Sequence, residues 1–314
     1  MLQAPDRHGV DTSLKTKASP PTWLIVAAFG AVYLIWGSTY LAIRVAIETM
    51  PPLLMAGSRF LIAGLILYPI MRMLGAPRPG LLYWRNATIV GALLLLIGNG
   101  GVSWAEQTVP TNITALIIAA TPLWIILVDW IRPEGSRPSA MVCAGLGLGF
   151  LGVGLIVVSR NAFGGRFVDP AGAIVLLIAA VCWAIGSIFS RHAKQSGSAL
   201  LNVAMQMISG GVLLLIAGLV SGEARHVEVE QISTASIGAF IYLTLFGSLV
   251  GFTAYVWLLQ VSTPARVSTY AYVNPFIALL LGRLFLNEAL PKSVLIAGCC
   301  ILAAVVLITL RKPK

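Results

Sequence analysis

The sequence predicts an all-α integral membrane protein with ten transmembrane helices, arranged as two inverted five-helix repeats. Three observations lead to this fold: a composition poor in charge, a series of apolar runs of membrane length, and an internal repeat. The chain has 314 residues, of which 58% are hydrophobic and only 10% charged. A soluble domain carries about 25% charged residues. We therefore expect the lipid bilayer to be the main surroundings of this chain.

The formal net charge of +10 does not indicate a nucleic-acid partner. Nucleic-acid binding proteins gather basic residues on one exposed face. Here the basic residues lie between apolar blocks, which is typical of loops that face the cytoplasm. We expect a small-molecule substrate and the bilayer as partners, and no nucleic acid.

Ten apolar runs of about 20 residues are long enough to cross a bilayer. The first follows a polar tail, residues 1–22, and lacks the small-residue exit of a cleaved signal peptide. Linkers such as Gln107–Pro110 and Thr263–Arg266 are short, so consecutive helices are expected to be antiparallel neighbours. The expected spans are roughly 23–43, 53–71, 87–105, 110–129, 140–159, 171–190, 199–220, 235–257, 265–286 and 292–310.

The distribution of Lys and Arg predicts the orientation. Of the 21 basic residues, 14 fall on the side of the two tails, five fall on the other side, and Arg59 and Arg283 lie inside spans. Cytoplasmic loops carry the excess of Lys and Arg. We therefore expect a multi-pass protein of the bacterial inner membrane with both termini cytoplasmic, which requires an even number of spans.

An internal repeat divides the chain into two halves. Trp36 and Arg44 recur as Trp183 and Arg191 at an offset of 147, at which Arg59 also corresponds to Gln206. Five helices is an odd number, so the halves must insert in opposite orientations, as in many secondary transporters. The expected units are a tail at 1–22, repeats at 23–160 and 161–310, and a tail at 311–314. From the third span the offset is 153, which matches Gly98, Trp104, Gln107, Pro122, Pro138 and Gly145 with Gly251, Trp257, Gln260, Pro275, Pro291 and Gly298.

Nothing in the apolar spans indicates an enzyme, a metal or a cofactor. His8, His192 and His226 lie in tails or loops, and no nucleophile–base motif or nucleotide loop is present. The four cysteines have no zinc spacing and are expected to be small apolar fillers. We expect no catalytic residue, no metal and no cofactor.

Polar and aromatic residues at membrane depth are the candidates for a substrate site, because burying them in lipid is costly. They recur on single helix faces of five different spans. We expect an amphipathic cavity with aromatic walls and polar groups that orient the substrate; the alternative, that they only pack or hydrogen bond between helices, stays open. The candidate residues are Trp36, Tyr40, Arg59, Asn99, Ser103, Glu106, Trp183, Ser187, Gln206, Tyr270 and Asn274.

Among the candidate residues, Arg59 is the most costly to bury in the membrane. It lies seven residues past Pro52, about 10 Å along a helix, where an unpaired charge costs roughly 2.5 kcal/mol or more. We give equal weight to two roles for Arg59. It forms a structural ion pair with Glu106 or Glu48, or it binds a substrate carboxylate. Glu106 is also the best-placed carboxylate for proton coupling. Pro122 and Pro275 are expected to kink the fourth and ninth spans, with a hinge role as the open alternative.

Four stretches together resemble the EamA family of the drug/metabolite transporter superfamily. They are IWGSTYLAIR in the first span, PPLLMAGSRFLIAG at 51–64, IGNGGVSWAEQ at 97–107 and YAYVNPFIALLLG at 270–282. The resemblance covers residues 23–310. It implies a ten-helix inverted repeat with cytoplasmic termini that exports small metabolites, often amino acids or amphipathic toxic compounds.

The expected function is export of small amphipathic metabolites by alternating access, either secondary active or facilitative. Amino acids, related compounds and cationic drugs are the substrates considered. A membrane-embedded enzyme acting on lipid-linked substrates, and a channel or scaffold, are the alternatives. The two halves supply a complete pseudosymmetric unit, so a monomer suffices, and a dimer stays open.

Overall fold

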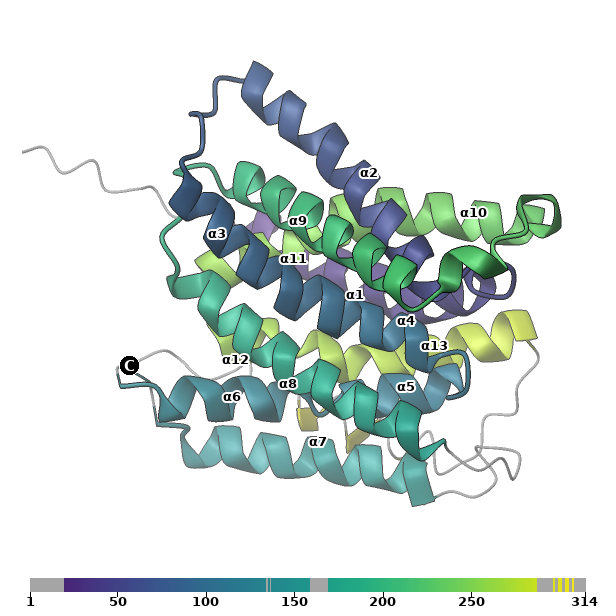
Figure 1. Ribbon diagram of the computed structural model, residues 1–314. Coiled ribbons are helices and arrows are strands. Elements are labelled where there is room, and N and C mark those ends of the chain that lie inside the picture. Colours follow the sequence, from purple (N-terminus) through teal and green to yellow (C-terminus); the bar gives the residue numbers. More distant parts are fainter. Residues whose placement is uncertain are drawn as a thin grey trace, which may run out of the picture.

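The computed structural model describes residues 20–133, 135, 137–158 and 169–286, and single residues of the C-terminal segment (296, 299, 300, 303, 304 and 307). Over this part the chain forms one helical bundle with no strand (Figure 1). In the picture α2 lies at one edge of the bundle and α7 at the other. The expected tenth span, the boundary near residue 160 and the tail at 311–314 lie outside the described residues, as does almost all of the tail at 1–22.

Six helices are long and apolar enough to cross a membrane, which confirms six of the expected spans. They are α1 (Thr22–Ala46), α2 (Pro52–Met73), the continuous α3–η1–α4, α8 (Pro170–His192), α9 (Ala199–Val220) and the continuous α10–η5–α11. The expected fourth span is two helices, α5 (Thr111–Ile118) and α6 (Thr121–Ile131), and the fifth is α7 (Ala140–Val158). The ninth is a short α12 (Pro264–Val267) followed by α13 (Tyr270–Leu286).

The repeated prolines, Pro122 and Pro275, occupy different positions in their helices. The helix breaks at Ala119 and Ala120, so Pro122 falls in the first turn of α6, where its missing N–H leaves no hydrogen bond unmade. The fourth span is therefore interrupted just before Pro122, and the expected kink and hinge role of this residue stay predictions. Pro275 lies inside α13, which continues through it.

The third and eighth spans each contain a ten-residue π-helical stretch that the sequence does not predict. The third consists of α3 (Leu81–Val90), η1 (Gly91–Gly100) and α4 (Gly101–Ala105). The eighth consists of α10 (Thr234–Tyr242), η5 (Leu243–Phe252) and α11 (Thr253–Val261). The two stretches occupy corresponding positions of the repeat. Since π-helical turns are rare and gather at functional sites, they direct attention to what these stretches face.

Helices α2 and α9, one from each half, approach each other closely. A Cβ added at Gly64 would lie 2.8 Å from the backbone nitrogen of Ile208, and one added at Gly211 would lie 2.6 Å from that of Leu61. These contacts are reciprocal, because Gly211 and Ile208 stand 147 residues after Gly64 and Leu61, as a local twofold axis requires. Gly57 approaches Leu215 in the same way. Residues 57, 61 and 64 of α2 contact residues 215, 211 and 208 of α9 in that order, so the two helices run antiparallel. Halves that insert in opposite orientations require this arrangement.

The substitution Gly211→Ala is expected to destabilise the protein. Its methyl group would meet backbone atoms of α2 that cannot rotate away, and overpacking of this kind costs about 1–3 kcal/mol. The matched control is Gly238→Ala on α10, where an added Cβ meets nothing within 4 Å. Thermal unfolding of the purified proteins in detergent measures the difference. Equal melting temperatures for the two variants would contradict the close approach.

Two acidic side chains tie the halves together at one end of the bundle. We call this end the distal end; it carries residues 47–51, 106–110 and 221–233. The Glu223 carboxylate accepts hydrogen bonds from the amides of Leu53 and Leu54 at the start of α2. Asp169 accepts one from the Thr108 hydroxyl, 2.8 Å away. Hydrogen bonds from Thr108 and then from the Gly172 amide hold the pKa of the Asp169 carboxyl below its ordinary value.

Candidate functional site

A cavity lies in the middle of the bundle, between helices of both halves. Its volume is about 60 Å³, room for a few water molecules and far less than the 300–1,000 Å³ of sites for drug-sized ligands. Its walls come from α1, α2, η1, α4, α5, α6, α8, η5 and α13. Seven of the eleven predicted site residues line it: Trp36, Tyr40, Arg59, Asn99, Trp183, Tyr270 and Asn274.

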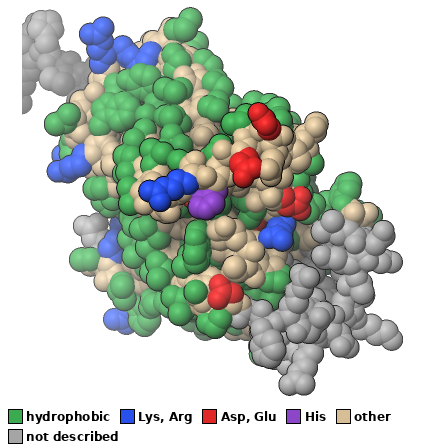
Figure 2. Space-filling model, turned by 45° about the vertical axis from the view of Figure 1, so that its right-hand side comes forward, with side chains coloured by type: hydrophobic (Ala, Val, Ile, Leu, Met, Phe, Trp, Pro, Cys, Tyr) green, Lys and Arg blue, Asp and Glu red, His purple; other side chains and the backbone are tan. Residues whose placement is uncertain are grey.

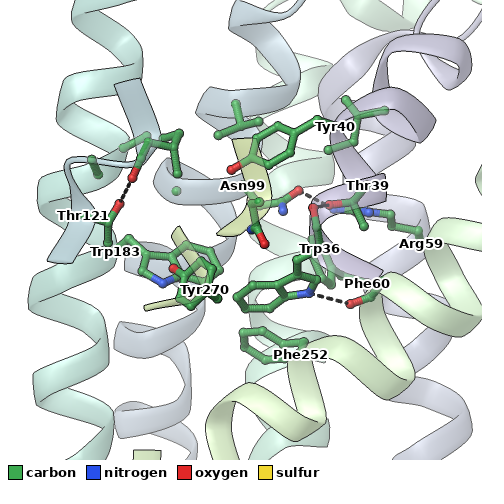
Figure 3. A pocket seen from close by; sticks show the side chains of 18 residues that line it. Trp36, Thr39, Tyr40, Arg59, Phe60, Asn99, Thr121, Trp183, Phe252 and Tyr270 are labelled. Atoms are coloured by element: carbon green, nitrogen blue, oxygen red, sulfur yellow. Dashed lines mark hydrogen bonds between the residues drawn. The ribbon is translucent and has the colours of Figure 1, made fainter. Parts of the chain in front are cut away.

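One side of the cavity is aromatic (Figure 3). The Trp36 ring lies 4.8 Å from that of Tyr255, 5.0 Å from that of Tyr270 and 5.4 Å from that of Trp183, measured between centroids. The Trp183 indole donates to the Tyr255 hydroxyl at 2.9 Å, and the Trp36 indole donates to the Gly247 carbonyl. We call Trp36, Trp183, Tyr255 and Tyr270 the aromatic cluster. Offset and edge-on ring pairs at these distances stabilise beyond their buried area, so the cluster is a rigid wall.

Glycines of the two π-helical stretches make room for the two tryptophans. A Cβ at Gly98 in η1 would lie 2.7 Å from the Trp183 ring, and one at Gly251 in η5 would lie 2.5 Å from Nε1 of Trp36. Each tryptophan therefore packs against the corresponding glycine of the other half.

The other side of the cavity is polar and carries a charge. Arg59 is only 2% exposed, its Nη2 donates to Oδ1 of Asn99, and its guanidinium carbon lies 4.4 Å from the centroid of the Phe60 ring. The Tyr40 hydroxyl neighbours the Asn274 amide, whose Oδ1 has no hydrogen-bond partner. A buried guanidinium and a free amide oxygen can orient a polar ligand group against the aromatic wall.

Four predicted residues do not line this cavity. Ser187 is hydrogen bonded to Tyr255 and thereby supports the aromatic cluster. Ser103 and Glu106 are fully buried on α4 and just past its end. Gln206 lies at a separate small cavity with Asn86, Ser190 and Asn202.

The sequence interpretation missed several residues of the site. Tyr255 has as many ring contacts as Trp36 and holds the aromatic cluster together from behind the cavity wall. Thr39, Thr121 and Phe252 line the cavity itself. A signal for Tyr255 existed: Gly247, Gly251 and Tyr255 recur at intervals of four, so the glycines mark the face that turns inward.

A larger cavity of about 450 Å³ opens at the distal end. Its walls include three carboxylates, Glu48, Glu223 and Glu228, together with His226. In Figure 2, where this end comes forward, acidic side chains are spread over the same face as a histidine, which has a Lys or Arg side chain beside it. Trp104 and Gln107, which flank Glu106 in the sequence, also line this cavity.

The helices enclose a buried cavity that is aromatic on one side and charged on the other. This is the architecture of a membrane transporter. The chain belongs to the EamA-like transporter family, whose model matches residues 22–158 and again 170–310. It is a multi-pass inner-membrane protein. The protein named uncharacterized inner membrane transporter YedA of Escherichia coli (strain K12) is 38% identical to it over 92% of this chain and 91% of that protein.

Two further comparisons bear on function and fold. The probable amino-acid metabolite efflux pump of Escherichia coli (strain K12) is 25% identical over 88% of this chain and 90% of that protein. A solved crystal structure superposes with a TM-score of 0.72 at 19% identity, covering 92% of this chain and 97% of that one. At that identity the likeness concerns the fold alone.

Proposed function

We propose that the protein exports small amphipathic metabolites, foremost amino acids and related compounds, by alternating access through the central cavity. One observation carries the proposal: helices of both halves enclose a single cavity whose walls combine a rigid aromatic cluster with one buried guanidinium. In alternating-access transporters with inverted repeats, the substrate site lies between the halves near the membrane midplane.

The chemistry of the walls favours an amino acid. A guanidinium matches the planar carboxylate with two parallel hydrogen bonds, and Arg59 supplies the charge at the cavity. The aromatic cluster offers an apolar surface to a side chain. The named function of the efflux pump among the relatives agrees with this substrate class. Cationic drugs are the second class, because aromatic rings also attract cations.

Transport requires the bundle to open. A cavity of about 60 Å³ is too small for most amino acids, so the site must widen before a substrate can enter. The interrupted fourth span and the two π-helical stretches supply backbone positions where helices can rearrange. The predicted orientation, with the distal end outside the cell, makes substrate leave past the larger distal cavity.

Uptake into proteoliposomes tests the proposal. A panel of labelled amino acids and cationic drugs is offered to the purified protein, with and without a pH gradient, and liposomes without protein are the control. We expect saturable uptake that unlabelled substrate inhibits. Failure of every compound to saturate or compete rejects the assignment. Flux proportional to concentration without saturation supports a channel, and turnover of a lipid-linked substrate supports an enzyme.

The placement of the site has its own test in the same assay. The substitution Trp36→Ala removes the ring at the centre of the aromatic cluster, and we expect it to lower transport at least tenfold. Transport equal to that of the wild-type protein would place the site elsewhere.

A further inference from the structure

Glu106 is a buried carboxylic acid whose side chain has no partner. It is 0% exposed, and neither carboxylate oxygen has a hydrogen-bond partner in the structure. It follows the cavity-lining Val102 by one helical turn and precedes Gln107, which lines the distal cavity. Glu106 therefore stands at the end of the third span, between the two cavities.

The charged and titratable groups around Glu106 come from two helices. Arg44 and Tyr40 lie on α1 and Arg59 lies on α2, all close enough to act on it electrostatically. Both guanidiniums are engaged elsewhere: Nη1 of Arg44 donates to the Glu106 backbone carbonyl at 2.7 Å, and Arg59 donates to Asn99. Neither forms an ion pair within 4.0 Å of the carboxylate in the described part of the chain. On the third packed helix, α8, Val175 and Ala179 face α4 and carry no charge.

The second half shows that the fold does not need this carboxylate. There Nη1 of Arg191 donates to the Leu259 carbonyl at 2.6 Å. Arg191 and Leu259 are the repeat equivalents of Arg44 and Glu106, so the same arginine–carbonyl contact is made where a leucine replaces the glutamate. The equivalent of Arg59 is Gln206. At these two positions the first half therefore carries a carboxyl group and a guanidinium, where the second half carries Leu259 and Gln206.

The lack of a partner determines the protonation of Glu106. A buried carboxylate that no donor hydrogen bonds and no cation pairs with directly is costly inside a membrane protein, whereas the neutral acid costs less. Burial without a bonded partner therefore favours the protonated form of Glu106, and ionisation calls for a cation in direct contact with it.

We propose that Glu106 is the coupling site of the transporter, where a proton and the ammonium group of a zwitterionic substrate bind in alternation. The proposal rests on the proposed function, because the substrate carboxylate binds Arg59. Glu106 lies behind the cavity wall, one helical turn from Val102, so the site must widen before the ammonium group reaches it. On contact the O–H bond of Glu106 breaks, the proton leaves to water, and the carboxylate accepts N–H bonds instead. After the zwitterion is released on the far side, a proton from that side takes its place. Each turnover moves one zwitterion out and one proton in.

Proton release on binding tests this exchange directly. Purified protein in weakly buffered detergent solution at neutral pH is titrated with L-phenylalanine and L-leucine. Tryptophan fluorescence reports binding and a pH-sensitive dye reports released protons. We expect about one proton per bound amino acid, and an apparent Kd that rises up to about tenfold per unit of falling pH, as linkage to one proton requires. N-acetyl-L-phenylalanine, which lacks the ammonium group, is expected to release none.

Variants assign the proton to Glu106. Glu106→Gln is expected to bind the amino acid without proton release and to exchange labelled for unlabelled substrate in liposomes, while losing acceleration by a pH gradient. Glu230→Gln, on the exposed distal surface and outside both cavities, serves as the matched control and should release protons like the wild type. Should Glu106→Gln fail to fold, Glu106→Asp is expected to keep the release with an altered pH dependence.

The possible results separate the two proposals. Saturable binding by the wild type without proton release overturns the coupling site and leaves the exporter standing. Undiminished release by Glu106→Gln also overturns it, because another group would then supply the proton. If neither amino acid binds saturably, the proposed coupling site is rejected. If no compound of the transport panel shows saturable uptake either, the proposed export function is rejected as well.

Discussion

The substitution Arg59→Gln is expected to weaken transport of carboxylate-bearing substrates about 10- to 100-fold. Hydrogen bonds to a charged group contribute about 1.5–3 kcal/mol, and each 1.4 kcal/mol corresponds to about a factor of ten in affinity. Glutamine stands at the equivalent position of the second half, as Gln206, so a buried helix of this fold accommodates it. The loss should appear as a higher KM in proteoliposome uptake, since the interaction holds the bound substrate.

Two controls separate charge from packing. Arg225→Gln removes an arginine that is exposed at the distal end and is expected to leave uptake unchanged. Arg59→Lys keeps the positive charge but loses the fork of donors, and it should fall between wild type and Arg59→Gln. Equal uptake by Arg59→Gln and wild type would remove Arg59 from the substrate site.

Hydropathy and the repeat predicted the positions of most helices because both depend on local sequence. Apolar runs of membrane length become helices since the bilayer leaves the backbone no other partner. The π-helical stretches and the break at Ala119 and Ala120 depend on which helix packs against which. The first stretch exists where Trp183 presses on Gly98, a contact between residues 85 positions apart.

Some repeat-equivalent residues meet at the central cavity and others lie apart, and the geometry of the repeat explains why. Arg59 is seven residues from the start of α2 at the distal end, and Gln206 is seven residues from the start of α9 at the opposite end. Because these two helices are antiparallel, equivalent residues away from the centre separate. Arg59 therefore lines the central cavity while Gln206 lines another. Trp36 and Trp183 lie near the middle of their helices, so they meet.

The substitution Trp36→Ala is expected to give the largest loss of stability among the cavity residues. Replacing a buried tryptophan by alanine costs about 3–5 kcal/mol, and ring pairs such as those to Tyr255, Tyr270 and Trp183 add about 0.5–1.5 kcal/mol each. Part of the Trp36 ring faces the cavity, so the lower end, about 3 kcal/mol, is expected in detergent unfolding. Trp23→Ala is the matched control, since Trp23 is 69% exposed on the same helix.

A double-mutant cycle tests whether the aromatic cluster joins the two halves. Trp36 comes from the first half and Trp183 from the second, and their rings cross edge to face at 82°. If the cluster is one unit, Trp36→Ala and Trp183→Ala together should destabilise less than the sum of the single changes, by about 0.5–1.5 kcal/mol. Additive losses would mean that each tryptophan is stabilised by its glycine in the other half (Gly251 for Trp36, Gly98 for Trp183) and not by the other indole ring. Coupled losses would mean that the wall of the cavity is also a contact that must loosen when the halves move, which links stability at this point to the rate of transport.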